Sequence, residues 1–405
     1  MPLQRAQLYA DSITTLVDFK SGFHLQASMR HMVSRLKALS FPKLVALQGL
    51  RIESSFQISL LKHFAQNAPG LHTIQVETWP ENGSILSVLS RFTGLTDLDV
   101  DLAYSGPRAV DGLNEDPEDD TEDDSKQGSH GLNQPGDVWT ESADATVWKS
   151  LTSASLSWGR TGWERIPPKM TKTLARCDRL AELRLRSKVY GDDLGPDFEG
   201  PGRGNPSFQA LRTLELWPAD RRAWERVGAM AGLRVLTLTF CPGEAEPEDL
   251  LCLSSLSGLT ELIIVQRESI SRAEFPLAAD HLLEITTAMK GLEVLRCDLA
   301  SGSLRHSKGL TERITREHPG LKELHFGFGV YQPYEALLAS SSLPRHQSLR
   351  RLLVSTMLVA NGAGEHGDNQ VDSHEGLERA ANAFKTLFPQ LEGFGSTEDC
   401  YEKVY

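Results

Sequence analysis

The chain has few cysteines and no long apolar run. Its 405 residues include five cysteines, and no two of them form a Cys-x-x-Cys pair, so a disulfide framework or a zinc knuckle is not supported. No stretch approaches the roughly 20 apolar residues of a membrane helix. The N-terminus, which begins Met1-Pro-Leu-Gln-Arg, lacks the apolar core of a secretory signal. These absences predict a soluble protein of the cytoplasm or nucleus.

A surplus of positive charge is also missing. The formal net charge is −12, and residues 107–140 hold ten acidic and two basic residues, which is −8 of that total and leaves −4 for the remainder. A nearly balanced body has no basic face for nucleic acid or an anionic membrane, so we expect neither as a partner. Residues 107–140 contain almost no large apolar side chain, which predicts a disordered acidic insert.

Motifs of catalysis and cofactor binding are absent as well. The chain has no Gly-x-x-x-x-Gly-Lys-Ser/Thr loop, no Gly-x-Ser-x-Gly and no His-Glu-x-x-His. Residues 362–367 match Gly-x-Gly-x-x-Gly, but no β-α-β pattern surrounds them. His366, Asp368, Asp372 and His374 share that segment without a metal-ligand spacing. We therefore expect a flexible loop at 361–373, no metal, no cofactor and no enzymatic activity.

What the sequence does contain is a repeated leucine phrase, Leu-x-x-Leu-x-Leu or a close variant. The first leucines of these phrases are Leu47, Leu71, Leu95, Leu151, Leu180, Leu211, Leu233, Leu259, Leu292, Leu321, Leu349 and, more weakly, Leu391. Most intervals lie at or just above the roughly 20–29 residues that one strand and one helical return require. The two longest gaps contain the acidic insert and the 361–373 loop.

Helical periodicity separates several of these phrases. Apolar residues recur at helical spacing in 57–67, 274–289 and 375–388, and a glycine or Pro-Gly stop precedes many of the leucine phrases. The combination predicts an α/β leucine-rich-repeat solenoid of about 11–12 repeats, with parallel strands on the concave face and helical returns outside. Only Cys241 occupies the Asn/Cys position that regular repeats carry, so we expect an irregular horseshoe.

The phrase does not repeat cleanly in residues 1–40. A degenerate strand at 12–19 and an amphipathic helix at 25–39 are the patterns found there. We predict that residues 1–40 form a helical N-terminal cap, because the first repeat of a solenoid needs its apolar edge covered. Residues 41–405 are then the repeat domain.

Alternation along each strand indicates which side chains point to the concave face. The predicted protein-binding residues are Asp97, Asp99, Asp101, Arg184, Arg186, Trp217, Val235, Ile263, Val265, Arg296 and His325. The aspartate row suits a basic partner segment or stays solvated, and the two arginines bind a carboxylate or phosphate or pair with neighbouring acids. The apolar set centred on Trp217 is either a binding hot spot or a patch that neighbouring loops cover.

The helical returns from Leu60 to Leu71 and from Ile314 to Leu321 resemble those of the leucine-rich-repeat region of fungal F-box proteins. In that family the repeats capture a substrate and an N-terminal F-box docks onto a cullin-type ubiquitin ligase. Residues 1–40 do not resemble the Leu-Pro-containing F-box. We predict a monomeric, non-catalytic scaffold that binds a protein partner on the concave face, with a substrate-receptor role as the narrower hypothesis. A ligand-sensing or enzyme-inhibiting horseshoe, or a paralogue without a selected partner, remains an alternative.

Overall fold

The computed structural model describes residues 3–17, 34–52, 55–78, 84–102, 148–158, 165–166, 168–194, 208–241, 244–267, 279–298, 310–326, 329–331, 346–354, 357–359 and 386–395. Its contacts divide the chain into two compact units, Met1–Leu180 and Ala181–Tyr405. The 107–140 insert and the 361–373 loop lie outside the described residues, so their predicted disorder stays a prediction. The same holds for the separation of a cap at residue 40.

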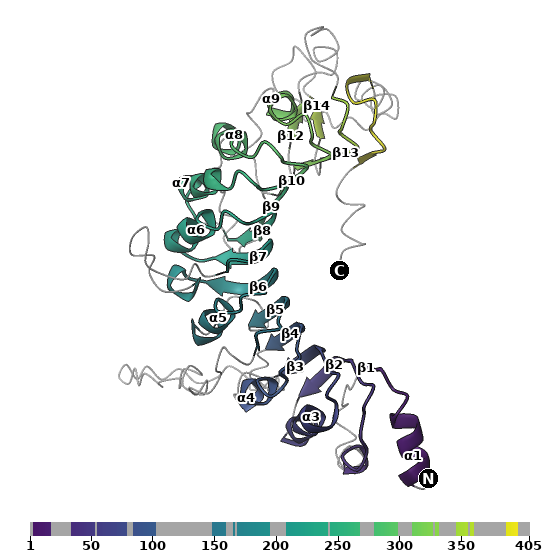
Figure 1. The fold of residues 1–405 in the computed structure, drawn as a ribbon. Coiled ribbons are helices and arrows are strands. Elements are labelled where there is room, and N and C mark those ends of the chain that lie inside the picture. The colour runs from purple at the N-terminus through teal and green to yellow at the C-terminus, as the bar shows by residue number, and fades with distance from the viewer. Residues whose placement is uncertain are drawn as a thin grey trace, which may run out of the picture. The chain divides into compact units, whose positions relative to one another are not determined.

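The first unit contains parallel strands that follow one another in chain order (Figure 1). Its strands are β1 (Thr15–Val17), β2 (Ala46–Ile52), β3 (Thr73–Thr78), β4 (Asp97–Leu102) and β5 (Ser153–Trp158). Its helices are α1 (Leu3–Ala10), α3 (Ser55–Asn67), α4 (Ser84–Leu89) and α5 (Pro168–Leu174). The predicted strand at 12–19 therefore exists as β1, which pairs with β2. Helix α1 was not predicted.

The second unit continues the same pattern of a strand followed by a return. Its parallel strands are β6 (Glu182–Val189), β7 (Thr213–Pro218), β8 (Val235–Phe240), β9 (Glu261–Gln266), β10 (Val294–Asp298), β11 (Glu323–Phe326), β13 (Arg351–Val354) and β15 (Gly393–Gly395). Its returns include α6 (Arg221–Gly228), α7 (Pro247–Leu250), α8 (Ala279–Thr287), α9 (Leu310–Glu317) and the 3-10 helices η4 (Gly191–Leu194) and η5 (Leu251–Ser255). Strands β12 (Gly329–Tyr331) and β14 (Met357–Val359) form a separate parallel pair.

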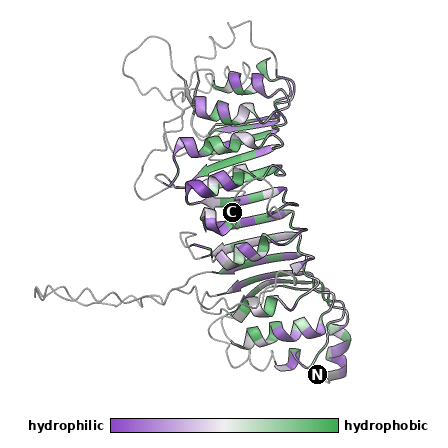
Figure 2. Ribbon diagram, turned by 60° about the vertical axis from the view of Figure 1, so that its left-hand side comes forward, coloured by the Kyte–Doolittle hydropathy of each residue, from purple (hydrophilic) through white to green (hydrophobic). Residues whose placement is uncertain are grey.

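Alternation along the strands places the leucines in the core. In β8, Leu236, Leu238 and Phe240 are buried, whereas Thr237 and Thr239 between them are only half-buried. Helices α6 to α9 lie along one side of the unit's strands (Figure 1), and both strands and helices carry hydrophobic segments (Figure 2). The leucines pack between strands and helices, because burial of each one stabilises the fold by about 1.5–3 kcal/mol.

A backbone turn links each return to its strand. The amide of Leu259 donates to the carbonyl of Leu256, and equivalent bonds recur before most of the marker leucines. The amides of Thr260 and Glu261 then both donate to the Arg234 carbonyl of the preceding repeat, at 2.8 and 3.0 Å. These repeated bonds stack the repeats in a constant register and satisfy buried backbone groups.

Two details of the predicted strands are wrong. The first repeat begins at Leu44 rather than Leu47, because the Leu44 amide closes the turn onto the Phe41 carbonyl. Strand β2 then has a bulge between Leu47 and Leu50, where Gly49 takes a φ of 66°, a left-handed conformation that glycine adopts without strain. Strands β13 and β14 belong to different sheets.

The predicted helices are present where the structure describes them. The 57–67 periodicity corresponds to α3, and the 274–289 periodicity corresponds to α8, which begins at Ala279. Of the 375–388 segment only the last residues are described, and they include a short helical turn. The strand register and the repeated turn make the fold an α/β leucine-rich-repeat solenoid, as the leucine phrase predicts.

Candidate protein-binding face

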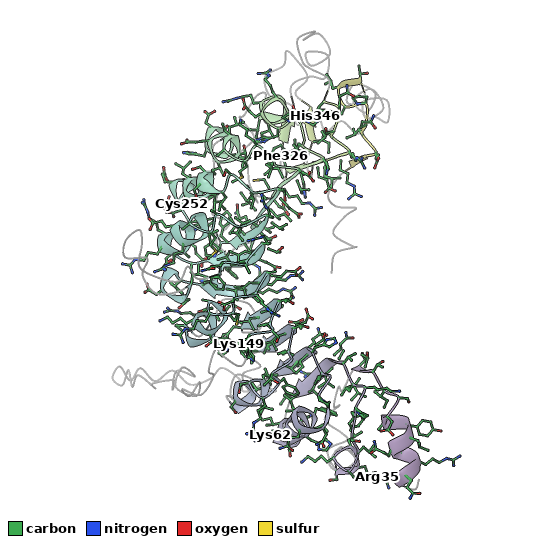
Figure 3. All side chains as sticks on the ribbon, viewed as in Figure 1. Arg35, Lys62, Lys149, Cys252, Phe326 and His346 are labelled. Atoms are coloured by element: carbon green, nitrogen blue, oxygen red, sulfur yellow. The ribbon has the colours of Figure 1, made fainter. Side chains whose placement is uncertain are left out.

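The predicted binding residues fall in both compact units. Asp97, Asp99 and Asp101 lie on β4 of the first unit, and the other eight lie on strands of the second. We call the side of the second unit's sheet that faces away from helices α6 to α9 the open face. Figure 3 shows side chains projecting from strands β6 to β9 on this side, while Cys252 lies on the helical side.

Asp97 and Asp99, two members of the aspartate row of the first unit, are bordered by neutral donors. In register, Asp97 lies between Thr73 and Ser153, and Asp99 lies between Gln75 and Ser155. The hydroxyl of Thr96 donates to Asp97 at 2.8 Å, and the Gln75 amide donates to Asp99 at 3.3 Å. Such hydrogen bonds lower the cost of placing the like charges of Asp97 and Asp99 in one row.

Trp217 is covered, in contrast to its predicted outward position. Only 1% of the residue is exposed. Its indole Nε1 donates to Glu244 Oε2 at 2.7 Å, and Lys188 Nζ lies 2.5 Å from Glu244 Oε1. Lys188 and Arg267 lie over the ring, at 5.6 and 5.0 Å from its centroid. The sequence left two interpretations open, a binding hot spot or a patch covered by neighbouring loops. For the Trp217 ring, the structure shows that neighbouring residues cover it.

The covering residues were not found from the sequence. A bulge in β6 between Leu185 and Lys188 brings Lys188 opposite Trp217. Glu244 follows β8, and Arg267 is the first residue after β9. The leucine phrase carries no signal for a bulge or for loop residues that return to a strand. Alternation therefore fails at the end of β7, where Trp217 and Pro218 are both buried.

The apolar part of the open face lies on strands next to the Trp217 cluster. Val235, Ile263 and Val265 are half-buried, so each presents part of its side chain. Ile263 lies between Thr237 and Arg296 in the register, and Val265 lies between Thr239 and Asp298. The structure adds two further half-buried apolar residues to this face, Val294 on β10 and Leu353 on β13. Strand alternation alone could have identified both.

Arginines flank this apolar region on either side. On β6, Arg184 lies 3.9 Å from Glu182, and Arg186 lies 3.6 Å from Glu215 on β7. Both contacts are long, and the Arg184 and Arg186 side chains are 46% and 49% exposed. Exposed ion pairs of this kind stabilise a fold by at most about 1 kcal/mol, so both guanidinium groups can exchange their partners easily.

A tighter cluster lies on the other side of the apolar region. Glu323 on β11 contacts Arg296 on β10 at 2.9 Å through one carboxylate oxygen and Arg351 on β13 at 3.2 Å through the other. Glu323 is 22% exposed, whereas Arg296 and Arg351 are 40% and 59% exposed. One carboxylate is thus shared by two guanidinium groups, and Asp298, two residues after Arg296 on β10, is a further acid on the same face.

His325 lies within this cluster, between Arg296 and Leu353 in the register. Burial, reinforced by the positive charge of Arg296, lowers the pKa of His325 to about 4. The ring is therefore neutral at physiological pH. Its Nε2 atom is buried and has no hydrogen-bond partner among the residues that the structure describes.

Chemistry other than binding finds no support in the part of the chain that the structure describes. There, no group of three or more His, Cys, Asp or Glu side chains is placed to hold a metal ion. The helices described are all too short or too polar to cross a membrane. Burial, followed by the neighbouring carboxylate, raises the pKa of the Cys177 and Cys241 thiols to about 11, so neither thiol is an activated nucleophile. The predicted loop at 361–373 lies outside these residues.

Comparison with known proteins finds solved structures that are similar to this chain. No family model and no curated protein matches the chain. An internalin of Listeria monocytogenes covers 89% of this chain and 87% of its own at 15% identity, with a TM-score of 0.36. The leucine-rich-repeat protein LegL7 of Legionella pneumophila covers 94% and 99% at 10% identity, with a TM-score of 0.38. A leucine-rich-repeat protein of Leptospira interrogans covers 97% and 98% at 13% identity, with a TM-score of 0.40.

The class of the protein follows from its own geometry. Parallel strands in chain order, each preceded by a buried turn and followed by a return, define an α/β leucine-rich-repeat solenoid. Proteins of this class present one long sheet face to their surroundings.

Proposed function

We propose that the second unit binds a protein partner on its open face and catalyses no reaction. The observation that carries the proposal is the set of half-buried apolar side chains on adjacent strands, Val235, Ile263, Val265 and Val294. Protein interfaces combine an apolar centre with a polar rim and are enriched in arginine. Here Arg184 and Arg186 supply the rim on one side, and Arg296 supplies it on the other.

The test compares partner capture by variants of the full chain. Ile263→Asp places a charge in the apolar centre, and we expect it to reduce recovery of a specific partner at least tenfold in affinity purification with quantitative mass spectrometry. Arg313→Gln is the control, because Arg313 pairs with Asp280 on the helical side. Circular dichroism establishes that both variants are folded. Equal recovery by the wild type and Ile263→Asp would contradict the proposal.

The narrower hypothesis is that the partner is a substrate delivered to a ubiquitin ligase. Its support is the resemblance of residues 60–71 and 314–321 to the repeats of fungal F-box proteins. Recovery of ligase core subunits in the same purification is the expected result, and their absence would remove this hypothesis while leaving the binding face intact. A single stoichiometric enzyme in the purified material would instead identify an inhibitor.

The aspartate row of the first unit is proposed as a second contact for a basic segment. Asp97 and Asp99 are half-buried and accept hydrogen bonds from hydroxyl and amide groups, so a cation can replace those partners at low cost. Changing Asp97 and Asp99 to lysine is expected to weaken capture of a partner that contacts the first unit. Unchanged capture would restrict binding to the second unit.

A further inference from the structure

We infer that the open face binds an extended protein segment in which one carboxylate side chain lies between two apolar side chains. This inference rests on the proposed function and assigns the partner's chemistry. It starts from the cluster of Arg296, Glu323 and Arg351, where two guanidinium groups share one carboxylate. A carboxylate from a partner accepts charge-assisted hydrogen bonds from these guanidinium groups.

The strand register gives this cluster apolar neighbours on both sides. One row of the sheet runs Ile263, Arg296, His325 and Leu353 across β9, β10, β11 and β13. Because neighbouring strands are about 4.8 Å apart, the two apolar ends lie about 14 Å from one another. An extended chain rises about 3.3 Å per residue, so its two apolar residues are about four positions apart, with the acidic residue midway.

Side-chain recognition, rather than strand addition, is the mode that the sheet allows there. Strands β9, β10 and β11 are each hydrogen-bonded on both sides, so none offers a free edge to a peptide backbone. The segment therefore crosses the strands and presents alternate side chains to them. Positions i, i+2 and i+4 of an extended chain point to the same side, which matches the apolar, acidic and apolar order.

Glu261 determines where on the face the acidic residue binds. It lies on β9 between Val235 and Val294 in the register, so it places a negative charge beside the apolar centre. Glu261 on β9 repels a partner carboxylate, whereas Arg296 on β10 and Arg351 on β13 attract it. The structure thus predicts that an acidic residue binds at one position along the face. It does not predict a general preference for acidic chains.

The probe is a set of fluorescein-labelled twelve-residue peptides with Gly-Ser flanks and the core Leu-Ser-Glu-Ser-Leu. Fluorescence anisotropy with the full chain measures their binding. Replacement of the central Glu by Lys is expected to weaken binding at least tenfold, because one charge-assisted contact contributes about 1.5–3 kcal/mol. Replacement by phosphoserine tests whether a phosphate source is preferred, and tenfold tighter binding of that peptide would overturn the assignment of a carboxylate.

The matched variants are Arg351→Gln and Arg313→Gln. Each removes one exposed guanidinium that forms an ion pair. Arg351 lies on the open face and Arg313 lies on the helical side. In Arg351→Gln, Glu323 still has its ion pair with Arg296. Arg351→Gln is expected to weaken the Glu peptide about tenfold, and Arg313→Gln to leave it unchanged. Equal binding of the Glu and Lys peptides, no binding of the Glu peptide, or no effect of Arg351→Gln would overturn the inference.

The inference and the proposed function fail in different ways. If Ile263→Asp abolishes capture of the cellular partner but the Glu peptide does not bind, only the assigned chemistry is wrong. If Ile263→Asp changes neither partner capture nor peptide binding, the open face is not the binding surface.

Discussion

At the residue scale, Trp217 shows how a side chain at an outward strand position becomes part of the core. Its indole N–H and the Lys188 ammonium share the Glu244 carboxylate, and the Lys188 and Glu244 side chains are each only 18% exposed. Glu244 therefore joins Trp217 and Lys188 through a single carboxylate. The cluster holds the C-terminal ends of β6, β7 and β8 together. It covers Trp217 there, so the open face does not extend to the end of β7.

Removal of the shared carboxylate is expected to destabilise the fold. Glu244→Ala leaves Lys188 without this ion pair and Trp217 Nε1 without this acceptor, and we expect the free energy of unfolding to fall by about 2–4 kcal/mol. Glu225→Ala is the control, because Glu225 pairs with Arg221 on an exposed helix surface and should change stability by no more than about 0.5 kcal/mol. Urea denaturation measures both. Equal values would show that the cluster does not stabilise the fold.

The buried His318 and the half-buried His325 predict a loss of stability in acid. Burial lowers the pKa of His325 to about 4 and also lowers the pKa of His318 from its ordinary value of 6.5. Below pH 6.5 the unfolded chain takes up these protons and the folded chain does not, so stability is complete above that pH and falls as the pH decreases towards 4. The slope approaches about 1.4 kcal/mol per pH unit for each proton.

Unfolding in urea at several pH values between 7 and 4.5 measures this slope. His325→Gln should reduce the slope in that range, since its side chain does not titrate. A slope identical to that of the wild type would show that His325 does not contribute.

At the element scale, contacts between successive returns decide where a glycine is required. A Cβ atom on Gly228, the last residue of α6, would lie 2.4 Å from the Cys252 carbonyl oxygen in η5. That contact is with backbone, so the two elements would have to move apart. The same packing gives the repeat stack its spacing at this point.

Alanine substitution of Gly228 should therefore reverse the usual preference for alanine in helices. We expect Gly228→Ala to lower the free energy of unfolding by about 1–3 kcal/mol through overpacking. Gly320→Ala is the matched control, because nothing lies within 4 Å of its Cβ position. Thermal unfolding followed by circular dichroism compares them. If Gly228→Ala melts at or above the temperature of Gly320→Ala, the close approach carries no strain.

The elements themselves were predictable to different degrees. Strands β3, β4, β8 and β11 lie where the leucine phrase places them. Each phrase contains apolar residues at every second position, which is the spacing of buried residues in a strand. The bulges in β2 and β6 were not predictable, because a bulge keeps the apolar residues and changes only their partners across the sheet. The missed helix α1 has no leucine phrase beside it.

At the scale of the whole molecule, the first unit keeps its register across a long insertion. Strands β4 and β5 pair from Asp97↔Ser153 to Leu102↔Trp158, although residues 103–152 separate them in the sequence. The repeat interface therefore does not need the insertion to be short, because loop closure entropy rises only slowly with length.

Replacement of residues 107–140 by a short Gly-Ser linker is expected to leave the fold unchanged. The free energy of unfolding should change by no more than about 1 kcal/mol, while the formal net charge falls from −12 to −4. Urea denaturation and isoelectric focusing measure the two effects. A loss of several kcal/mol would show that the insert packs against the repeats.

The sequence by itself determined the solenoid class, the order of most strands and the side chains that alternate outward. These depend on local periodicity, which a chain carries in its residue types. Only the tertiary structure decided which outward positions are available. Trp217 was covered by residues from β6 and from the segments after β8 and β9, and Arg296 and Arg351 met at Glu323 because of strand register. Such contacts join residues distant in sequence, and their free energy depends on burial and geometry that no single repeat contains.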